Sequence, residues 1–249
     1  MDIGKAGKAI ITFIRARAQQ GAVVGMSGGV DSSLVAALCA EALGKDKVLG
    51  LIMPSNATSR EDTGDAEDFA NKLGIEHRTI AIANTLESIK SLLPGRSKIA
   101  DANLAPRARM VILYHCANSL NRLVAGTGNR SELLTGYFTK YGDGGVDILP
   151  IGGLYKNEVC MLAKETGVPV KIINKAPSAG LWPGQTDEGE IGLSYNELDS
   201  ILPALFDDKK TAGQAAKDTG IGLEKMKRVL YLHGKNKHKL SMPPIAEVR

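Results

Sequence analysis

The sequence predicts an α/β protein, a single doubly wound domain over residues 1–249 with a mainly parallel five-stranded sheet flanked by helices. Short apolar runs rich in β-branched residues alternate with amphipathic stretches over the first 130 residues, which is typical of repeated strand–helix–strand units. A hydrophobic fraction of 43% supplies enough apolar surface for a core and excludes disorder as the main state. Such sheets bind ligands at the carboxyl ends of their strands, where we expect the site.

Four apolar runs have the length expected of buried parallel strands. A strand that is buried on both faces has no polar side, so a continuous apolar run rather than an alternating one is expected. The predicted strands are residues 22–26, 48–53, 78–82 and 122–125.

Helical patterns fill the segments between these strands, and residues 9–14 belong to a first helix ahead of them. Ser59 followed by Asp62 resembles a capping box with Asp in place of Glu. Pro106 falls in a first helical turn, where proline is tolerated. The predicted helices are residues 31–43, 59–73, 84–92 and 103–121.

The pattern changes after Gly128, where loops become longer. Long loops in compact domains are usually functional or mobile. In order, we expect a glycine-rich stretch at 136–153, a helix near 156–166, a Pro- and Gly-containing segment at 177–192, and helices at 195–202 and 223–232.

Charge and cysteine content exclude several classes of protein. The net charge of +4 falls short of a dedicated nucleic-acid surface. Cys39, Cys116 and Cys160 contain no CxxC pair, so neither a disulfide framework nor a cysteine zinc site is indicated. The apolar stretch at 9–14 is too short to span a bilayer. We therefore expect a cytoplasmic protein that binds neither nucleic acid nor membrane.

The strongest local signal is Ser-Gly-Gly-Val-Asp-Ser-Ser at residues 27–33, between a predicted strand and a predicted helix. Glycines let the backbone turn tightly, so that amide groups, serine hydroxyls and the positive end of the helix dipole point at a phosphate. An acid inside such a loop would repel phosphate unless a metal intervened, which makes Asp31 a candidate magnesium ligand. The alternative is a plain Gly-Asp-Ser turn with a serine N-cap.

No Gly-x-x-x-x-Gly-Lys-Ser/Thr motif occurs, which excludes a Walker-type P-loop. The loop instead resembles the pyrophosphate loop of the ATP pyrophosphatases, which split ATP into AMP and pyrophosphate and use AMP to activate a substrate. The resemblance implies an adenine nucleotide alpha hydrolase-like fold.

A second site element is Gly-Thr-Gly-Asn-Arg-Ser-Glu at residues 126–132, again at a strand end. Thr127 offers a hydroxyl, and Glu132, one turn into the next helix, could share a cation with Asp31. The alternative for Glu132 is a first-turn acid that only complements the helix dipole. A dinucleotide fingerprint would need glycine or alanine at Ser131.

A third element, residues 135–147, carries aromatic rings, a lysine and a carboxylate on a glycine-rich loop. With its flanking segments it resembles the ammonia-dependent NAD synthetases, and this resemblance runs from residue 27 to residue 244 in the family's order. Further matching segments are Arg-Ala-Arg-Met at 107–110, Leu-Tyr-Lys at 154–156, Ala-Pro-Ser-Ala at 176–179, Gln-Thr-Asp-Glu at 185–188 and His-Lys at 238–239.

The resemblance implies roles for particular residues. Asp31, Glu132 and Lys156 would be catalytic, with Asp31 and Glu132 binding Mg2+. The residues implied to bind ATP are Gly25, Met26, Ser27, Gly28, Gly29, Val30, Asp31, Ser32, Thr127, Lys156 and Ser178. Those implied to bind deamido-NAD are Arg107, Lys140, Asp147, His238 and Lys239. Arg109 and Trp182 receive no role.

The implied reaction is the ATP-dependent amidation of deamido-NAD with ammonia, through an adenylylated intermediate, to give NAD, AMP and pyrophosphate. Because only 26 residues precede the phosphate loop, we expect no glutaminase domain and free ammonia as the nitrogen donor. The family also implies a homodimer, with residues 103–121 as a candidate interface helix.

Two other functions remain open from the residues alone. A tRNA-thiolating enzyme would share the nucleotide loop but needs a catalytic cysteine pair or a basic extension. A nucleotide-sensing module, like the universal stress proteins, would bind ATP without turnover.

Overall fold

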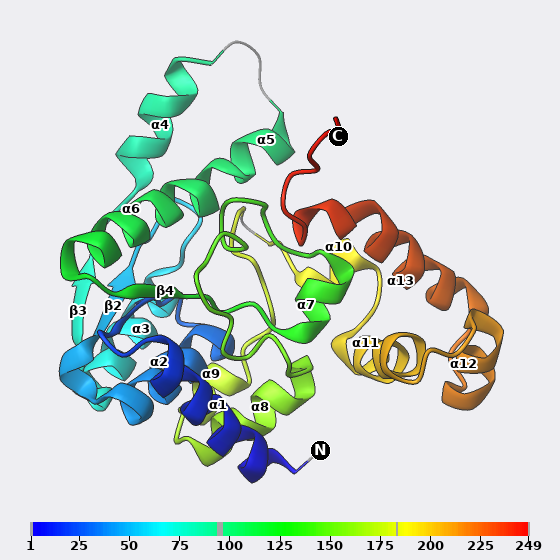
Figure 1. Cartoon of the computed structure of the whole chain (residues 1–249). Coiled ribbons are helices and arrows are strands. Elements are labelled where there is room, and N and C mark those ends of the chain that lie inside the picture. Colours follow the sequence, from blue (N-terminus) through cyan, green and yellow to red (C-terminus); the bar gives the residue numbers. More distant parts are fainter. Residues whose placement is uncertain (1, 94–96, 183, 249) are drawn as a thin grey trace.

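The structure is a computed structural model that describes residues 2–93, 97–182 and 184–248. A parallel four-stranded sheet lies at its centre with helices on both faces (Figure 1). Its strands are β1 (Ala22–Gly25), β2 (Val48–Ile52), β3 (Glu76–Thr79) and β4 (Leu123–Ala125), in the order β3-β2-β1-β4. The predicted α/β class with a parallel sheet is confirmed.

The expected fifth strand is absent from the described part of the chain. Ile148 makes only an isolated parallel bridge to Ala125 beside β4, where Gly126 N donates to Ile148 O at 2.8 Å. Pro150 stands two residues later, and a proline has no N–H with which to extend the pairing. The sheet therefore ends after β4 in a single bridge.

Strand β3 is shifted from the predicted range of 78–82 and is not buried. It lies at the edge of the sheet, and the side chains of Glu76, Arg78 and Thr79 are exposed. The apolar half of the predicted run follows the strand, and Ile82, which is fully buried, still donates its N–H to Pro54 O at 2.9 Å. An edge strand needs few apolar side chains, which explains why the apolar run misplaced it.

All the predicted helices are present, with small shifts at their ends. The helices through α7 are α1 (Ile3–Arg17), α2 (Val30–Leu43), α3 (Arg60–Leu73), α4 (Ala83–Ser91), α5 (Lys98–Ala102), α6 (Leu104–Leu120) and α7 (Arg130–Thr135). The later helices are α8 (Lys156–Glu165), α9 (Val170–Ile173), α10 (Asp187–Ile191), α11 (Tyr195–Leu202), α12 (Ala212–Thr219) and α13 (Leu223–Asn236). Helices α5, α9 and α10, which were not predicted, are too short for a clear apolar period. Helix α12 was not predicted either.

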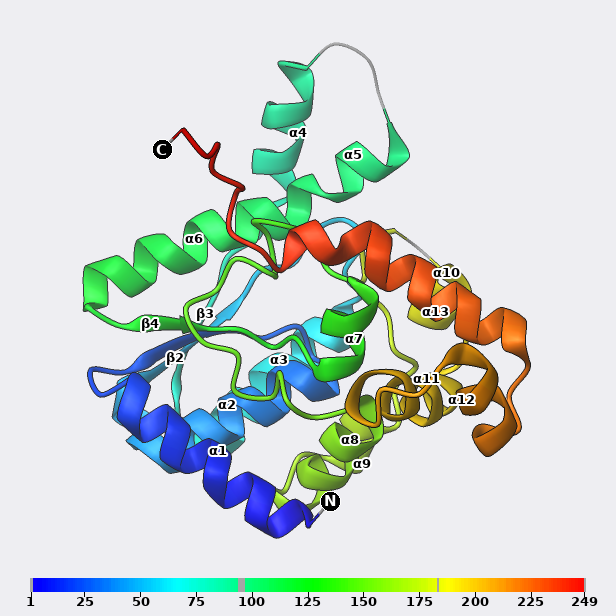
Figure 2. The ribbon, with the colours of Figure 1, turned by 45° about the vertical axis from the view of Figure 1, so that its right-hand side comes forward.

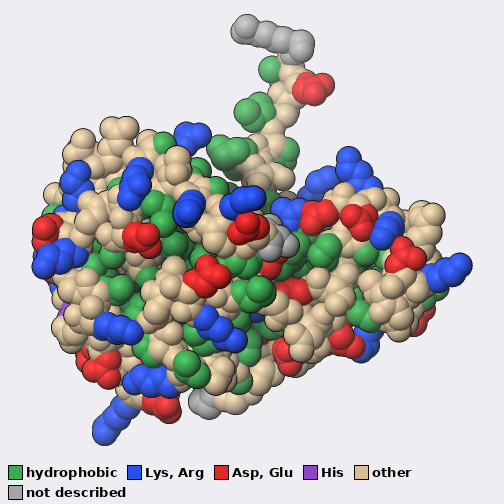
Figure 3. Space-filling model, turned by 90° about the horizontal axis from the view of Figure 1, so that it is seen from below, with side chains coloured by type: hydrophobic (Ala, Val, Ile, Leu, Met, Phe, Trp, Pro, Cys, Tyr) green, Lys and Arg blue, Asp and Glu red, His purple; other side chains and the backbone are tan. Residues whose placement is uncertain are grey.

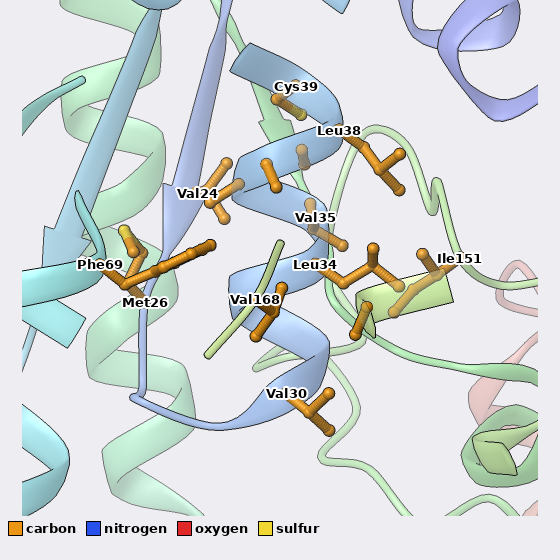
Figure 4. Close-up of a cluster of buried hydrophobic side chains, with 14 of the residues drawn as sticks. Val24, Met26, Val30, Leu34, Val35, Leu38, Cys39, Phe69, Ile151 and Val168 are labelled. Carbon is orange, nitrogen blue, oxygen red and sulfur yellow. The ribbon is translucent and has the colours of Figure 1, made fainter. Parts of the chain in front are cut away.

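The two faces of the sheet pack against different helices. Alternate residues of a strand point to opposite faces, so Val24 belongs to the cluster covered by α1, α2, α3 and α8, whereas Val23 belongs to the one covered by α6. Figure 4 shows the first cluster, where Leu34 of α2 lies beside Ile151 and Val24 of β1 packs on the other side of the helix. This packing places the N-terminus of α2 directly after β1.

A third apolar cluster lies beyond the sheet, in the unit formed by helices α10 to α13 (Figure 2). Its buried members include Tyr195, Leu198, Ile201 and Met226. Helix α11 contacts α7 and α8, and α13 contacts α7. The helical unit is therefore anchored on the two helices that carry Glu132 and Lys156.

The three cysteines are free thiols. Cys39 is buried in α2, where burial raises the pKa of its thiol to about 12. Lys and Arg side chains are interspersed with Asp and Glu over the face shown in Figure 3. Among the described residues, none of the helices combines the length and the apolar character that crossing a membrane would require.

Candidate active site

The loop between β1 and α2 is built around glycine. Gly28 has φ +80°, and a Cβ atom there would lie 2.2 Å from the carbonyl oxygen of Asp62, at the start of α3. Ser32 Oγ accepts from Ser27 N at 3.2 Å and donates to Gly29 O at 3.1 Å. The tight turn therefore depends on Gly28 and is fixed by a serine from the first turn of α2.

Asp31, also in that first turn, is the centre of a polar cluster. Its Oδ1 accepts from Asn129 Nδ2 at 2.9 Å, and its Oδ2 forms an ion pair with Lys156 Nζ. Lys156 is the first residue of α8 and is only 5% exposed. The fold thus joins residues that are 98 and 125 positions apart in the sequence.

Glu132 faces the same cluster from α7. Asn129 and Glu132 form a capping box: Asn129 Oδ1 accepts from Glu132 N at 3.0 Å, and Glu132 Oε2 accepts from Asn129 N at 3.1 Å. Asn129, fully buried, therefore holds both predicted metal ligands, a role that the sequence reasoning missed. The N-cap position with glutamate three residues later was the available signal.

The charges in the cluster perturb one another. Burial raises the pKa of Glu132, and the negative charge of Asp31 raises it further, against the opposing effect of Lys156. Burial alone would lower the pKa of Lys156, but Asp31, Glu132 and Asp187 together raise it. Lys156 is therefore held as a buried cation among three acids.

Asp31 and Glu132 suit a hard divalent cation. Their carboxylate oxygens are the donors that Mg2+ prefers, and a cation would relieve the repulsion that raises the pKa of Glu132. No group of three or more His, Cys, Asp or Glu side chains suited to a metal occurs in the described ranges. The two carboxylates therefore fit an ion that takes its remaining ligands from phosphate and water.

A cavity of about 810 Å³ opens in front of this cluster. Its wall includes the carboxyl ends of β1 and β4, the start of α8 and the segment that leads to α10. The predicted ATP residues that line it are Gly25, Met26, Ser27, Gly29, Val30, Asp31, Ser32, Thr127, Lys156 and Ser178, with Glu132 beside them. Gly28 is not in the wall and acts through the shape of the loop.

The predicted deamido-NAD residues form a second group around the glycine-rich loop. Arg107 Nε donates to Lys140 O at 3.3 Å, and Lys140 Nζ donates to His238 O at 2.7 Å. Lys239 Nζ donates to Gly136 O at 2.6 Å and to Phe138 O. Of this group, only Lys239 belongs to the described cavity wall.

Asp147 lies apart from the rest of this group. Its carboxylate accepts from Tyr114 Oη at 2.9 Å and from Val124 N at 2.8 Å. In this structure it therefore fixes the loop to β4 and α6.

The two residues without a predicted role both line the cavity. Arg109 Nε donates to Met53 O at 3.0 Å, and burial lowers the pKa of its guanidinium. The ring of Trp182 has Lys98 Nζ 4.4 Å from its centroid. Trp182 is therefore a wall residue and not a plug in the core.

Comparison with known proteins agrees with the family resemblance found in the sequence. The NAD synthase family model matches residues 4–243. An NH(3)-dependent NAD(+) synthetase of Archaeoglobus fulgidus is 51% identical over 254 residues, covering 100% of this chain and 99% of its own.

Two of the similar solved structures match this chain over almost the whole length of both chains, with 99% of this chain covered. An NMN synthetase from Francisella tularensis has a TM-score of 0.87 and 34% identity, with 99% of its own chain covered. An NH3-dependent NAD synthetase from Campylobacter jejuni, in complex with the nitrate ion, has a TM-score of 0.84 and 32% identity, with 100% of its own chain covered.

Proposed function

The chain belongs to the NAD synthase family, and from that premise we infer that it amidates deamido-NAD with ammonia, using ATP, to form NAD, AMP and pyrophosphate. The protein is thus a ligase that forms a carbon–nitrogen bond. One observation links this function to the site. The cluster of Asp31, Lys156 and Glu132 lies at the phosphate loop, in a cavity of about 810 Å³.

The chemistry requires activation of a carboxylate, because its oxygen is a poor leaving group toward ammonia. A carboxylate oxygen of the nicotinate attacks the α-phosphorus of ATP, and the bond to the bridging oxygen breaks to release pyrophosphate. Ammonia then attacks the acyl carbon of the adenylate, loses a proton, and displaces AMP. Both steps depend on positioning and on neutralising developing charge.

Different residues of the cavity are assigned to different parts of this reaction. We assign Gly25 to Ser32 to the phosphates, since all of them except Gly28 line the cavity at the N-terminus of α2, where the helix dipole favours an anion. We assign Lys156 to the leaving pyrophosphate, since it is the buried cation of the cluster. Thr127 and Ser178 add hydroxyl groups to the cavity wall.

Magnesium fits this assignment. We propose that Asp31 and Glu132 hold Mg2+ when ATP is bound. The ion supplies charge neutralisation for the triphosphate. Asp31 then binds the metal and also forms an ion pair with Lys156, whereas Glu132 interacts with Lys156 electrostatically.

The acceptor end of the site is proposed to lie at the glycine-rich loop. Arg107, Lys140, His238 and Lys239 provide four basic side chains there, a set suited to the phosphates of deamido-NAD. We assign Asp147 to the same substrate as an acceptor for a ribose hydroxyl, from its separate position against Tyr114 and Val124. Lys239 reaches the cavity wall and so joins the two regions.

We further propose a cytoplasmic homodimer whose subunits, residues 1–249, each form one synthetase domain that takes ammonia directly. The exposed side of α6 supports the dimer, since Val111 is 71% exposed and Arg107 lies on the same side. Sedimentation equilibrium tests this, and a monomer at working concentration would contradict it.

The function is tested by measuring AMP, pyrophosphate and pyridine nucleotide from ATP and Mg2+, with ammonium, with glutamine, or with neither. Deamido-NAD and nicotinate mononucleotide are compared as acceptors, because an NMN synthetase is among the structural relatives. Equal amounts of AMP and NAD, only with ammonium, are expected. A strong preference for the mononucleotide would overturn the dinucleotide assignment, and the absence of turnover would overturn the ligase.

A further inference from the structure

Lys156 is contacted by helix α11, which lies outside the nucleotide-binding sheet. Its ammonium group pairs with Asp31 on one side and lies 5.2 Å from the centroid of the Tyr195 ring on the other. That separation is within the range of a cation–π interaction, which is stronger when desolvated. Tyr195 is 4% exposed and is the first residue of α11.

Tyr195 is itself fixed at both its backbone and its side chain by α10. Its N–H donates to Glu188 Oε1 at 2.8 Å, and its hydroxyl donates to Asp187 Oδ2 at 3.1 Å. Asp187 is 4% exposed, and its N–H donates to Pro177 O at 3.2 Å, next to Ser178 in the cavity wall. The ring therefore has little freedom to turn away from Lys156.

Helix α11 also holds the backbone of Lys156. Asp199 Oδ1 accepts from Ser131 Oγ at 2.6 Å, and Ser131 Oγ accepts from Lys156 N at 3.1 Å. The other oxygen of Asp199 accepts from Asn157 N at 2.7 Å. One helix thus caps the start of α8 and places an aromatic face beside the lysine's ammonium group.

We propose that Tyr195, oriented by Asp187, is a positioning residue for Lys156. A lysine side chain has four rotatable methylene groups, so the ion pair to Asp31 alone leaves several approaches open. The ring confines the ammonium group between its face and Asp31, at the cavity that Tyr195 and Lys156 both line. Because the benefit depends on what Lys156 does, this inference rests on the proposed function.

A double-mutant cycle tests the proposal in the full-length protein. Tyr195→Leu removes the ring, and Tyr195→Phe keeps it while removing the hydroxyl that Asp187 orients. We expect Tyr195→Leu to lower kcat roughly 30-fold with a small change in the KM for ATP, and Tyr195→Phe to recover most of that loss. In a Lys156→Ala background, Tyr195→Leu should have no further effect.

Phe206→Leu is the matched control, since Phe206 packs on the same apolar cluster and not on Lys156. It should leave kcat unchanged. Thermal unfolding verifies that each variant is folded. If Tyr195→Leu lowers kcat equally with and without Lys156, or if Phe206→Leu has the same effect, the role is structural and the proposal is wrong.

Calorimetric titration with pyrophosphate repeats the cycle without turnover. Tyr195→Leu should weaken pyrophosphate binding about tenfold when Lys156 is present and not in the Lys156→Ala background. An equal loss in both backgrounds overturns the proposal even where catalysis cannot be measured. A wild-type protein that binds pyrophosphate through this pair but forms no NAD would overturn only the proposed function.

Discussion

Gly28→Ala is expected to impair both ATP turnover and stability, because it distorts the phosphate loop. The residue has φ +80°, where a non-glycine residue costs about 1–2 kcal/mol. The added Cβ would also lie 2.2 Å from Asp62 O and 2.9 Å from Asp62 C. Ordinary carbon–oxygen contacts begin at about 3.3 Å, so the loop or α3 must move by about 1 Å.

A displacement of this size at a reacting centre can lower the rate by about 100-fold. We therefore expect kcat/KM for ATP to fall by about that factor, measured by coupled pyrophosphate release. The free energy of unfolding, measured in urea, should fall by about 1–3 kcal/mol. The lower end applies if only backbone strain remains, and the upper end if part of the steric clash remains as well.

Gly220→Ala separates backbone strain from the clash. Gly220 has φ +71° at the end of α12, and a Cβ there would meet nothing within 4 Å. This variant should lose about 1 kcal/mol of stability and keep full activity. Equal kcat/KM in Gly28→Ala, Gly220→Ala and the wild type would refute the claim that the contact with α3 sets the shape of the loop.

Asp31→Asn should lower kcat about 100-fold, because it removes a metal ligand and the charge that pairs with Lys156; full magnesium-dependent turnover would exclude the ligand role. Chelation of Mg2+ by EDTA should abolish turnover, and added Mg2+ should restore it. Lys239→Met should raise the KM for deamido-NAD about tenfold and leave that for ATP unchanged, since it frees the loop that Lys239 holds; equal changes in both would contradict this. Burial would raise the pKa of Asp65, but Lys171 and Lys175 lower it below its ordinary value. The stability from this group is therefore present above about pH 4 and is lost as pH falls through the lowered pKa, so in urea titrations Asp65→Asn should cost about 2 kcal/mol at pH 7 and progressively less toward pH 2.

Local pattern was sufficient for the phosphate loop and for most helices. Glycines between an apolar run and a helical period predict a tight turn at a helix start, and Gly28 has the positive φ that this turn requires. The predicted ends of α2 and α3 were close to the observed ones because local residues mark them. Gly44 ends α2, and Ser59 is the N-cap of α3.

Sheet position was decided by tertiary structure. The apolar residues of the run at 78–82 are its last three, yet the paired residues are Glu76–Thr79, because pairing with β2 depends on backbone register and an edge strand needs little burial. The expected fifth strand became a single bridge at Ile148, which only the packing beside β4 could show.

The family resemblance named Asp31, Glu132 and Lys156 from the sequence, because each stands at a recognisable strand or helix end. It did not identify the residues that hold these three side chains in place. Asn129 joins Asp31 across 98 positions, and Tyr195 reaches Lys156 from a helix outside the sheet. Local sequence determines backbone shape within a few residues, whereas the burial and mutual charges that prepare this site arise only where distant segments exclude water together.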